Sequence, residues 1–295
     1  MVLLPLAGCS SVSRQPTSRA SQTALVVISL RWWRFAMSVR ESALTRIKKF
    51  MVGLLLSTTA SVSAEVLRLA GDAWPPYTDQ TLPGDGLSVE LIRTALGRAG
   101  YDVTYTEVPW ERAVLGLQQG KYDIINDWFT TRHADYATYS RPFLSNRVRW
   151  VQRQGAGIRY EGRESLRTYD IVLTNGYAYS DELADDSTLN KGYANNFVQA
   201  ARMLLADRAD LALEDERTVL FHFNGSLKDV SDGLSFVPGE FSIRDLSLVV
   251  RNDHPQQAAI IAAFNREIEA MVEDGTYAAI FARHGLPSPN SLPQP

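Results

Sequence analysis

The sequence predicts an α/β protein of two lobes, each with a parallel-rich sheet flanked by helices. One observation is that the apolar–polar alternation of strands is followed repeatedly by the three- and four-residue apolar spacing of helices. A second is that this alternation runs in two successive series, and strand–helix–strand order favours parallel pairing with right-handed crossovers. A third is that no Gly/Ser-rich linker separates the series, so ordered segments are expected to join the lobes.

The first series contains three strands and two helices. Glycines at or near the end of each predicted helix are typical of helix C-termini. Strands are predicted at 65–71, 101–108 and 122–126, and helices at 87–100 and 110–120.

The second series follows residues 141–155. Residues 254–285 have the pattern of a long amphipathic helix and a shorter one, divided at Gly275. Before them we expect a strand at 169–176, a helix at 195–209, a strand passing into a helix at 210–223, and a strand at 246–253.

The first 64 residues differ from the rest. Residues 46–64 combine a basic start, a short apolar stretch and a small-residue end, the pattern of a secretory signal cleaved before Glu65. We therefore predict a signal peptide at 37–64, starting at Met37, export to the periplasm, and a non-native upstream extension at 1–36. An alternative lipoprotein-type signal ends at Cys9, but only eight residues precede it and none is basic.

Charge and cysteine content narrow the function. Eight of the 30 Lys and Arg but one of the 33 Asp and Glu lie in residues 1–64, so the remainder carries a formal charge near −10. This argues against nucleic acid or an anionic membrane as a partner. Cys9 is the only cysteine, which excludes disulfides, thiol catalysis and cysteine-bound metal after residue 64.

Catalytic motifs are absent from the sequence. It contains no GxSxG, HExxH or phosphate-binding loop, and its four histidines do not have metal-ligand spacing. We therefore predict a binding protein with no cofactor and no metal, and no enzyme.

Six motifs follow one another along the chain. They are "GDAWPPYT", "VPWERAVLGLQQGKYDII", "YSRPFLSNRVRWVQR", "NGYAYSDEL", "RADLALEDERTVLFH" and the ending "DHP…FN…DGTYAAIFARHGL". In this order they resemble the family 3 periplasmic solute-binding proteins, the polar amino-acid binders of ABC importers. The resemblance covers nearly all of residues 65–287 and is nearest to a divergent branch with "PWER".

The resemblance implies two α/β lobes joined by two crossing strands, with a ligand held between them by hinge closure. Lobe 1 would comprise residues 65–147 and 250–287, and lobe 2 residues 153–244, with a C-terminal tail at 288–295. Ligands bind beyond the carboxyl ends of parallel strands, at such interfaces.

Aromatic residues are the first candidates for the ligand site. Trp74 and Tyr77 lie on a loop stiffened by two prolines, and Trp110 follows Pro109 after a strand. The resemblance implies that Trp74 and Trp110 sandwich the ligand or face its ammonium group, which aromatic rings attract. Packing against neighbouring loops is the alternative.

Charged residues are the second group of candidates. The resemblance implies that Asp215, at the end of an apolar strand, binds the ligand ammonium, although it could also cap the following helix. The resemblance implies an arginine that grips the ligand carboxylate, but counting back from Ser140 places its position on His133, one residue after Arg132, in a shortened loop. Either Arg132 takes this role, or the protein does not hold a carboxylate in the conventional way. Trp128 occupies a place where small residues are expected and would narrow the pocket.

The remaining candidates complete the site. The resemblance implies that backbone N–H groups near Gly176 and Tyr177 meet the ligand carboxylate, since helix N-termini favour anions. Arg112 of "PWER" faces either the cleft or an acid on its own helix. We also include Asp72, which lies just ahead of Trp74, and Asn126 and Thr130, which lie in the same stretch as Trp128 and Arg132.

The function predicted from the sequence is capture of a small polar ligand, an amino acid or related amine, for the permease of an ABC importer. We expect a monomer. Two alternatives remain: signalling of ligand occupancy to a membrane receptor, and catalysis resembling that of cyclohexadienyl dehydratase on the same scaffold.

Overall fold

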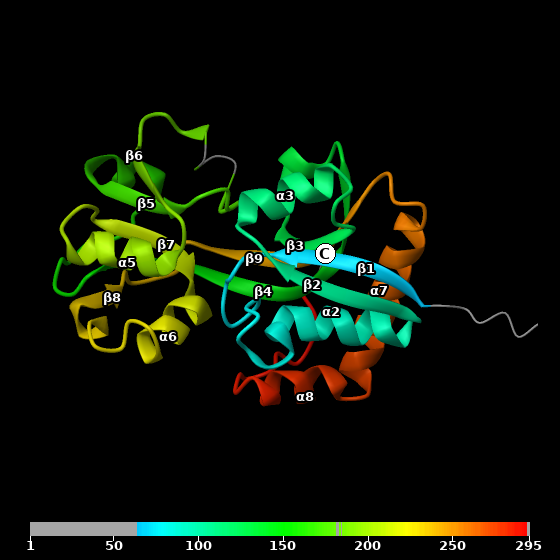
Figure 1. The fold of residues 1–295 in the computed structure, drawn as a ribbon. Helices are drawn as coiled ribbons and strands as arrows, with labels where there is room; N and C mark the ends of the chain where they lie inside the picture. Colours follow the sequence, from blue (N-terminus) through cyan, green and yellow to red (C-terminus); the bar gives the residue numbers. More distant parts are fainter. Residues whose placement is uncertain (1–63, 181–182, 184, 294–295) are drawn as a thin grey trace, which may run out of the picture. The chain divides into compact units, whose positions relative to one another are not determined.

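The computed structural model describes residues 64–180, 183 and 185–293 (Figure 1). The predicted upstream extension and nearly all of the predicted signal peptide lie outside the described residues. In the described part, no helix has both the length and the apolar character needed to span a membrane.

The described strands form one mixed sheet. Its order is β2-β1-β3-β9-β4-β7-β5-β6, and β8 pairs with β4. The pairs β1–β2, β1–β3, β5–β6 and β5–β7 are parallel, and every pair that involves β4 or β9 is antiparallel. The strands are β1 (Glu65–Gly71), β2 (Tyr101–Glu107), β3 (Ile124–Trp128), β4 (Ala137–Arg153), β5 (Asp170–Thr174), β6 (Asn190–Ala194), β7 (Leu211–Asp215), β8 (Leu234–Phe236) and β9 (Ser242–Arg251).

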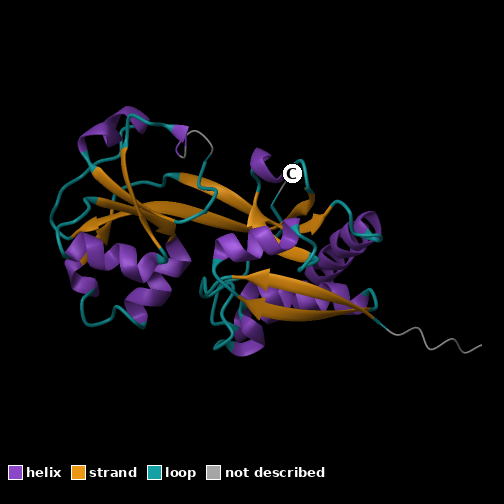
Figure 2. Ribbon diagram, turned by 45° about the horizontal axis from the view of Figure 1, so that its top comes forward, coloured by secondary structure: helices purple, strands orange, loops and turns teal. Residues whose placement is uncertain are grey.

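The helices cover the sheet in two groups, which confirms the predicted fold class (Figure 2). Lobe 1 denotes β1–β3 with α2, α3, α7 and α8, and lobe 2 denotes β5–β8 with α5 and α6. The long strands β4 and β9 pair with each other and run between the lobes. The helices are α2 (Leu87–Arg98), α3 (Trp110–Gln118), α5 (Phe197–Leu205), α6 (Glu216–Asn224), α7 (Gln257–Glu273) and α8 (Thr276–Arg283).

Helix ends differ from the predicted ends for local reasons. The Asn196 side chain accepts a hydrogen bond from Gln199 N, so α5 begins at Phe197 rather than at 195. Gly275 adopts a left-handed φ of 81°, which divides α7 from α8 as the sequence predicts.

Each lobe has buried apolar packing of its own. Val172, Phe197 and Leu204 belong to a cluster under α5 and α6 in lobe 2. Ala70, Leu117 and Ile125 belong to another, which packs α3 onto lobe 1. The loops that follow β1, β3 and β5 are therefore held by packed elements.

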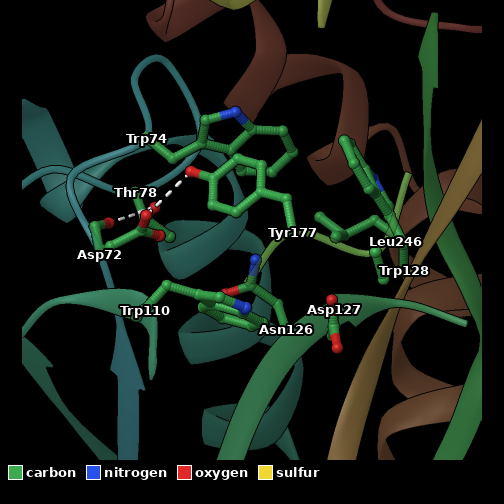
Figure 3. Close-up of a pocket in the computed structure, with 11 residues that line it drawn as sticks. Asp72, Trp74, Thr78, Trp110, Asn126, Asp127, Trp128, Tyr177 and Leu246 are labelled. Atoms are coloured by element: carbon green, nitrogen blue, oxygen red, sulfur yellow. Dashed lines mark hydrogen bonds between the residues drawn. The ribbon is translucent and has the colours of Figure 1, made fainter. Parts of the chain in front are cut away.

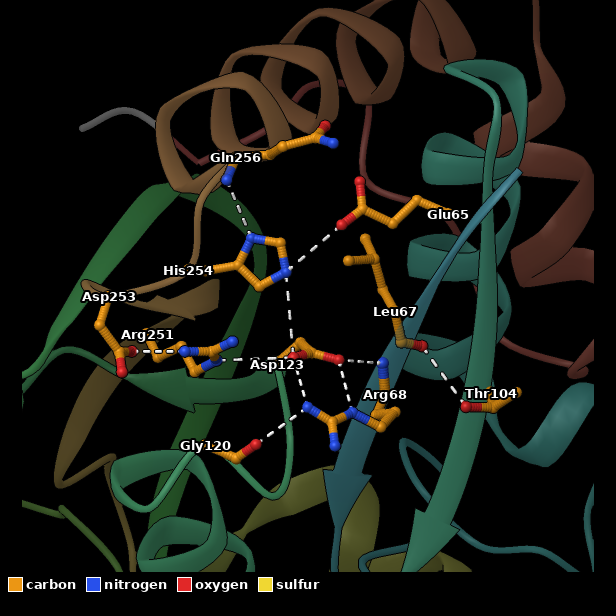
Figure 4. A network of polar contacts seen from close by, with 10 residues as sticks. All are labelled: Glu65, Leu67, Arg68, Thr104, Gly120, Asp123, Arg251, Asp253, His254 and Gln256. Carbon is orange, nitrogen blue, oxygen red and sulfur yellow. Dashed lines mark hydrogen bonds and ion pairs between the residues drawn. The ribbon is translucent and has the colours of Figure 1, made fainter. Parts of the chain in front are cut away.

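Asp123 anchors a polar network at the start of β3 (Figure 4). Its carboxylate accepts hydrogen bonds from Arg68 N, Nε and Nη2 at 2.9, 2.8 and 2.8 Å. The same carboxylate lies 3.5 Å from Arg251 Nε and 3.9 Å from His254 Nε2. Burial alone would raise the pKa of Asp123, but the hydrogen bonds and charge of Arg68 lower it below its usual value.

We expect Asp123→Asn to lower the free energy of unfolding by about 1–3 kcal/mol at pH 7, because charge-assisted bonds to Arg68 are lost. A lowered pKa means that this stabilisation exists above the unfolded pKa and disappears as the pH falls through the folded one. Urea unfolding at pH 7 measures the loss in the variant, and urea unfolding at pH 3 measures how much of the stabilisation disappears in acid. Asp102→Asn, on the exposed side of β2, is the control. An equal effect of the two variants at pH 7 would contradict the anchoring role.

Candidate ligand-binding site

A small cavity lies between the loops after β1 and β5, the start of α3 and the end of β3 (Figure 3). Its volume is about 30 Å³, which holds water but no amino acid. Residues of both lobes and of β9 line it: Gly71, Asp72, Trp74, Thr78, Trp110, Asn126, Asp127, Trp128, Tyr177, Ala178 and Leu246.

The proline loop after β1 forms a tight turn that closes on itself. Trp74 N donates to Thr78 O at 2.7 Å, and Tyr77 N and Thr78 N donate to Trp74 O at 2.9 and 3.1 Å. Pro75 and Pro76 have no N–H group, so these bonds fall on the flanking residues. The turn places Trp74 in the cavity wall and buries Tyr77 completely, outside the cavity lining.

Four aromatic rings surround the cavity. Tyr177 of lobe 2 makes edge contacts with the three tryptophans of lobe 1, with ring centroids 6.2 Å from Trp74, 6.3 Å from Trp110 and 6.1 Å from Trp128. Trp74 and Trp128 also meet edge to face at 5.5 Å. Such geometry is favourable for aromatic pairs, so the rings form an ordered wall.

Hydrogen bonds between the lobes hold them together around this wall. In each, a hydroxyl or indole N–H of one lobe donates to an oxygen of the other. The bonds are Tyr177 OH to Asp72 Oδ2 (2.8 Å), Trp110 Nε1 to Gly176 O (3.1 Å), Trp74 Nε1 to Glu214 Oε1 (3.1 Å) and Tyr77 OH to Asp215 Oδ1 (2.9 Å).

Acidic groups dominate the electrostatics. Burial raises the pKa of Asp72 to about 6, against the effect of the hydrogen bond from Tyr177. Burial raises the pKa of Glu214 to about 8, and the charges of Asp215 and Asp72 add to this. The site therefore favours the protonated forms of its acids, or a cation placed beside them.

Asn126 and Trp128 lie on the same side of β3 because side chains alternate along a strand. Trp128 Nε1 donates to Asn146 Oδ1 at 2.9 Å. The side-chain oxygen of Asn126 is buried at the cavity and has no hydrogen-bond partner in the part of the chain that the structure describes. Asp127, between them, pairs with His133 Nδ1 at 2.9 Å.

The candidates for a carboxylate clamp lie away from the cavity lining. Thr130 is buried, and its hydroxyl accepts from Arg132 N at 3.3 Å at the start of a 3₁₀ turn, Thr131–His133. This turn directs Arg132 outward, where it is half exposed and pairs with Asp185 at 2.6 Å. Arg112 is exposed on α3.

Asp215 is fully buried and caps α6. Of the predicted site residues, the structure thus brings six together around the cavity: Asp72, Trp74, Trp110, Asn126, Trp128 and Tyr177. Gly176 adjoins them through the bond from Trp110. Tyr77, Arg112, Thr130, Arg132, His133 and Asp215 lie outside the lining.

Sequence reasoning missed part of the lining. Thr78 belongs to the "GDAWPPYT" motif, and Asp127 lies between the predicted site residues Asn126 and Trp128. Both could therefore have been predicted from the sequence. Leu246 reaches the cavity from β9, and no sequence signal connects it to the proline loop.

Comparisons with known proteins agree with this architecture. The model of the bacterial extracellular solute-binding proteins, family 3, matches residues 67–287. A probable amino-acid ABC transporter-binding protein of Haemophilus influenzae is 23% identical over 220 residues, covering 70% of this chain and 79% of the relative.

Solved structures show the same fold. A histidine kinase sensor domain similar to periplasmic binding proteins superposes with a TM-score of 0.67 at 21% identity, covering 77% of this chain and 99% of that one. An ancestral amino acid-binding protein, a precursor of cyclohexadienyl dehydratase, gives a TM-score of 0.59 at 19% identity, covering 74% and 94%.

Proposed function

Since this chain belongs to family 3 of the bacterial extracellular solute-binding proteins, we propose that it captures a small polar ligand between its lobes and delivers it to the permease of an ABC importer. The relative named as an ABC transporter-binding protein supports this partner. We further propose that residues 37–64 direct export to the periplasm and that the mature protein is a monomer.

One observation carries the proposal of capture by closure. The cavity is lined by Asp72 and the tryptophans of lobe 1 and by Tyr177 of lobe 2, and the Tyr177–Asp72 hydrogen bond joins the two lobes at this lining. Separating the lobes opens the site, and closing them buries its contents. Lobe 1 would comprise residues 65–147 and 250–287, and lobe 2 residues 153–244.

We expect a bound metabolite to raise the melting temperature of the full chain, because it binds only the folded state. At 100 times Kd the gain is about 2.7 kcal/mol, which corresponds to roughly 5–10 °C. Differential scanning fluorimetry against amino acids, amines and small organic acids measures it. If no compound raises the melting temperature, the capture proposal fails.

Trp110→Ala should reduce this rise, because it removes one wall of the cavity. Leu115→Ala, on the same helix and 48% exposed, is the matched control and should leave the rise unchanged.

Catalysis is the second candidate, because Asp72, with a pKa raised to about 6, lies beside the Tyr177 hydroxyl and could move a proton. Incubating the chain with cyclohexadienyl acids and following them by NMR distinguishes the two functions. Binding without conversion supports capture alone, whereas multiple turnovers abolished by Asp72→Asn would establish an enzyme.

A further inference from the structure

The cavity offers a ligand hydrogen-bond acceptors and aromatic faces, but no positively charged side chain. None of the eleven described residues that line it is Lys, Arg or His. Resting on the proposed capture of a small ligand, we propose that the ligand is a protonated organic amine without a carboxylate group.

The acceptors match an ammonium group. Asn126 is 5% exposed, lines the cavity, and its side-chain oxygen has no partner among the described residues. The Asp72 carboxylate lies on the same cavity, where it accepts a hydrogen bond from the Tyr177 hydroxyl (Figure 3). An ammonium group carries only donors, so it suits both kinds of acceptor on this cavity, the buried amide oxygen and the buried carboxylate.

The rings strengthen this match. Trp74, Trp110, Trp128 and Tyr177 place their rings around the same space. Aromatic faces attract cations, and the attraction increases when the cation is desolvated. Because the cavity is only about 30 Å³, the amine must displace the Tyr177 hydroxyl and replace it as the donor to Asp72.

A carboxylate has no counterpart in this cavity. Arg132 is paired with Asp185 outside the lining, and Arg217 donates to Tyr77 OH and Ser145 O at 3.2 and 3.0 Å. The backbone N–H of Tyr177 already donates to Thr174 O at 3.3 Å. A ligand carboxylate would lie near Asp72 with no Lys, Arg or His among the described lining residues to pair with it, and an unpaired buried charge is costly.

Matched pairs test the proposal, because each amino acid and its decarboxylated amine share one side chain. The pairs are ornithine and putrescine, lysine and cadaverine, arginine and agmatine, histidine and histamine, and tyrosine and tyramine. With the full chain, fluorimetry followed by titration calorimetry should give at least one amine a Kd ten or more times lower than that of its amino acid.

Two variants test whether Asp72 binds the amine. Asp72→Asn should raise the Kd of that amine about 10- to 100-fold, because it removes one charge-assisted bond. Glu111→Gln removes one negative charge from an exposed position of α3 outside the lining, and should change the Kd less than threefold. Circular dichroism confirms that both variants are folded.

The outcomes distinguish the amine assignment from the proposal of ligand capture. An amino acid that binds as tightly as its amine, or unchanged amine binding in Asp72→Asn, overturns the amine assignment and leaves ligand capture intact. If other classes of metabolite raise the melting temperature and no amine does, the amine assignment alone is wrong. If nothing raises it, capture itself is wrong.

Discussion

Asp215→Ala is expected to lower the free energy of unfolding by about 3–5 kcal/mol, as when one partner is removed from a buried charged network. The Asp215 side chain is completely buried. Its Oδ1 accepts from Thr218 N at 3.0 Å and Tyr77 OH at 2.9 Å, and its Oδ2 accepts from Asn146 Nδ2 at 3.2 Å. Alanine leaves all three donors without a partner and removes the cap of α6.

Urea unfolding followed by circular dichroism at pH 7 measures this loss. Asp215→Asn retains the side-chain volume and one acceptor oxygen, so it should lower the free energy of unfolding by less than Asp215→Ala does. Asp229→Ala, at an exposed turn, is the control and should change the free energy by less than about 0.5 kcal/mol. A loss below 1 kcal/mol for Asp215→Ala would show that this network does not stabilise the fold.

Glu214 should make the ligand-free protein less stable as the pH rises. Its pKa is raised to about 8 from 4.5 by burial, by Asp215 and by Asp72. Between these values the folded state holds a proton that the unfolded state releases, so stability is greatest below the unfolded pKa and falls as the pH approaches 8. Between pH 5 and pH 8 the titration of Glu214 should lower the free energy of unfolding by about 3–4 kcal/mol.

Urea unfolding at several values from pH 5 to pH 8 tests this with Glu214→Gln, which keeps the shape but cannot titrate. The variant should lose most of the slope, and Asp72, with its pKa raised to about 6, should account for part of what remains. Glu161→Gln, at an exposed position, should keep the wild-type slope. Identical slopes for wild type and Glu214→Gln would contradict the buried, protonated state of Glu214.

The fold was largely predictable because helix and strand periodicity is local. Both strand–helix series and the division at Gly275 follow from residues close in sequence. The full lengths of β4 and β9 were not predictable. β9 pairs with β3 of lobe 1, β4 pairs with β7 and β8 of lobe 2, and the two long strands pair with each other; all of these pairings join residues at least 59 positions apart.

The residues of the cavity wall could be predicted from the sequence where they follow a strand. Trp74, Trp110 and Tyr177 follow β1, β2 and β5, whose carboxyl ends meet at the site. Tyr77 could not be placed, because its hydroxyl bonds to Asp215, 138 residues away. Arg132 could not be placed either, because a short 3₁₀ turn and Asp185 of lobe 2 decide its direction.

Closure of the two lobes over a ligand is tested most directly by double electron–electron resonance. Spin labels at Leu115→Cys on α3 and Tyr193→Cys on β6, both about half exposed, report across the site once Cys9→Ser has removed the native cysteine. A pair at Tyr193→Cys and Leu220→Cys within lobe 2 is the control. The compound that raises the melting temperature most should convert a broad distance distribution into one narrow, shorter distance for the first pair alone. An unchanged distribution with bound ligand would contradict capture by closure.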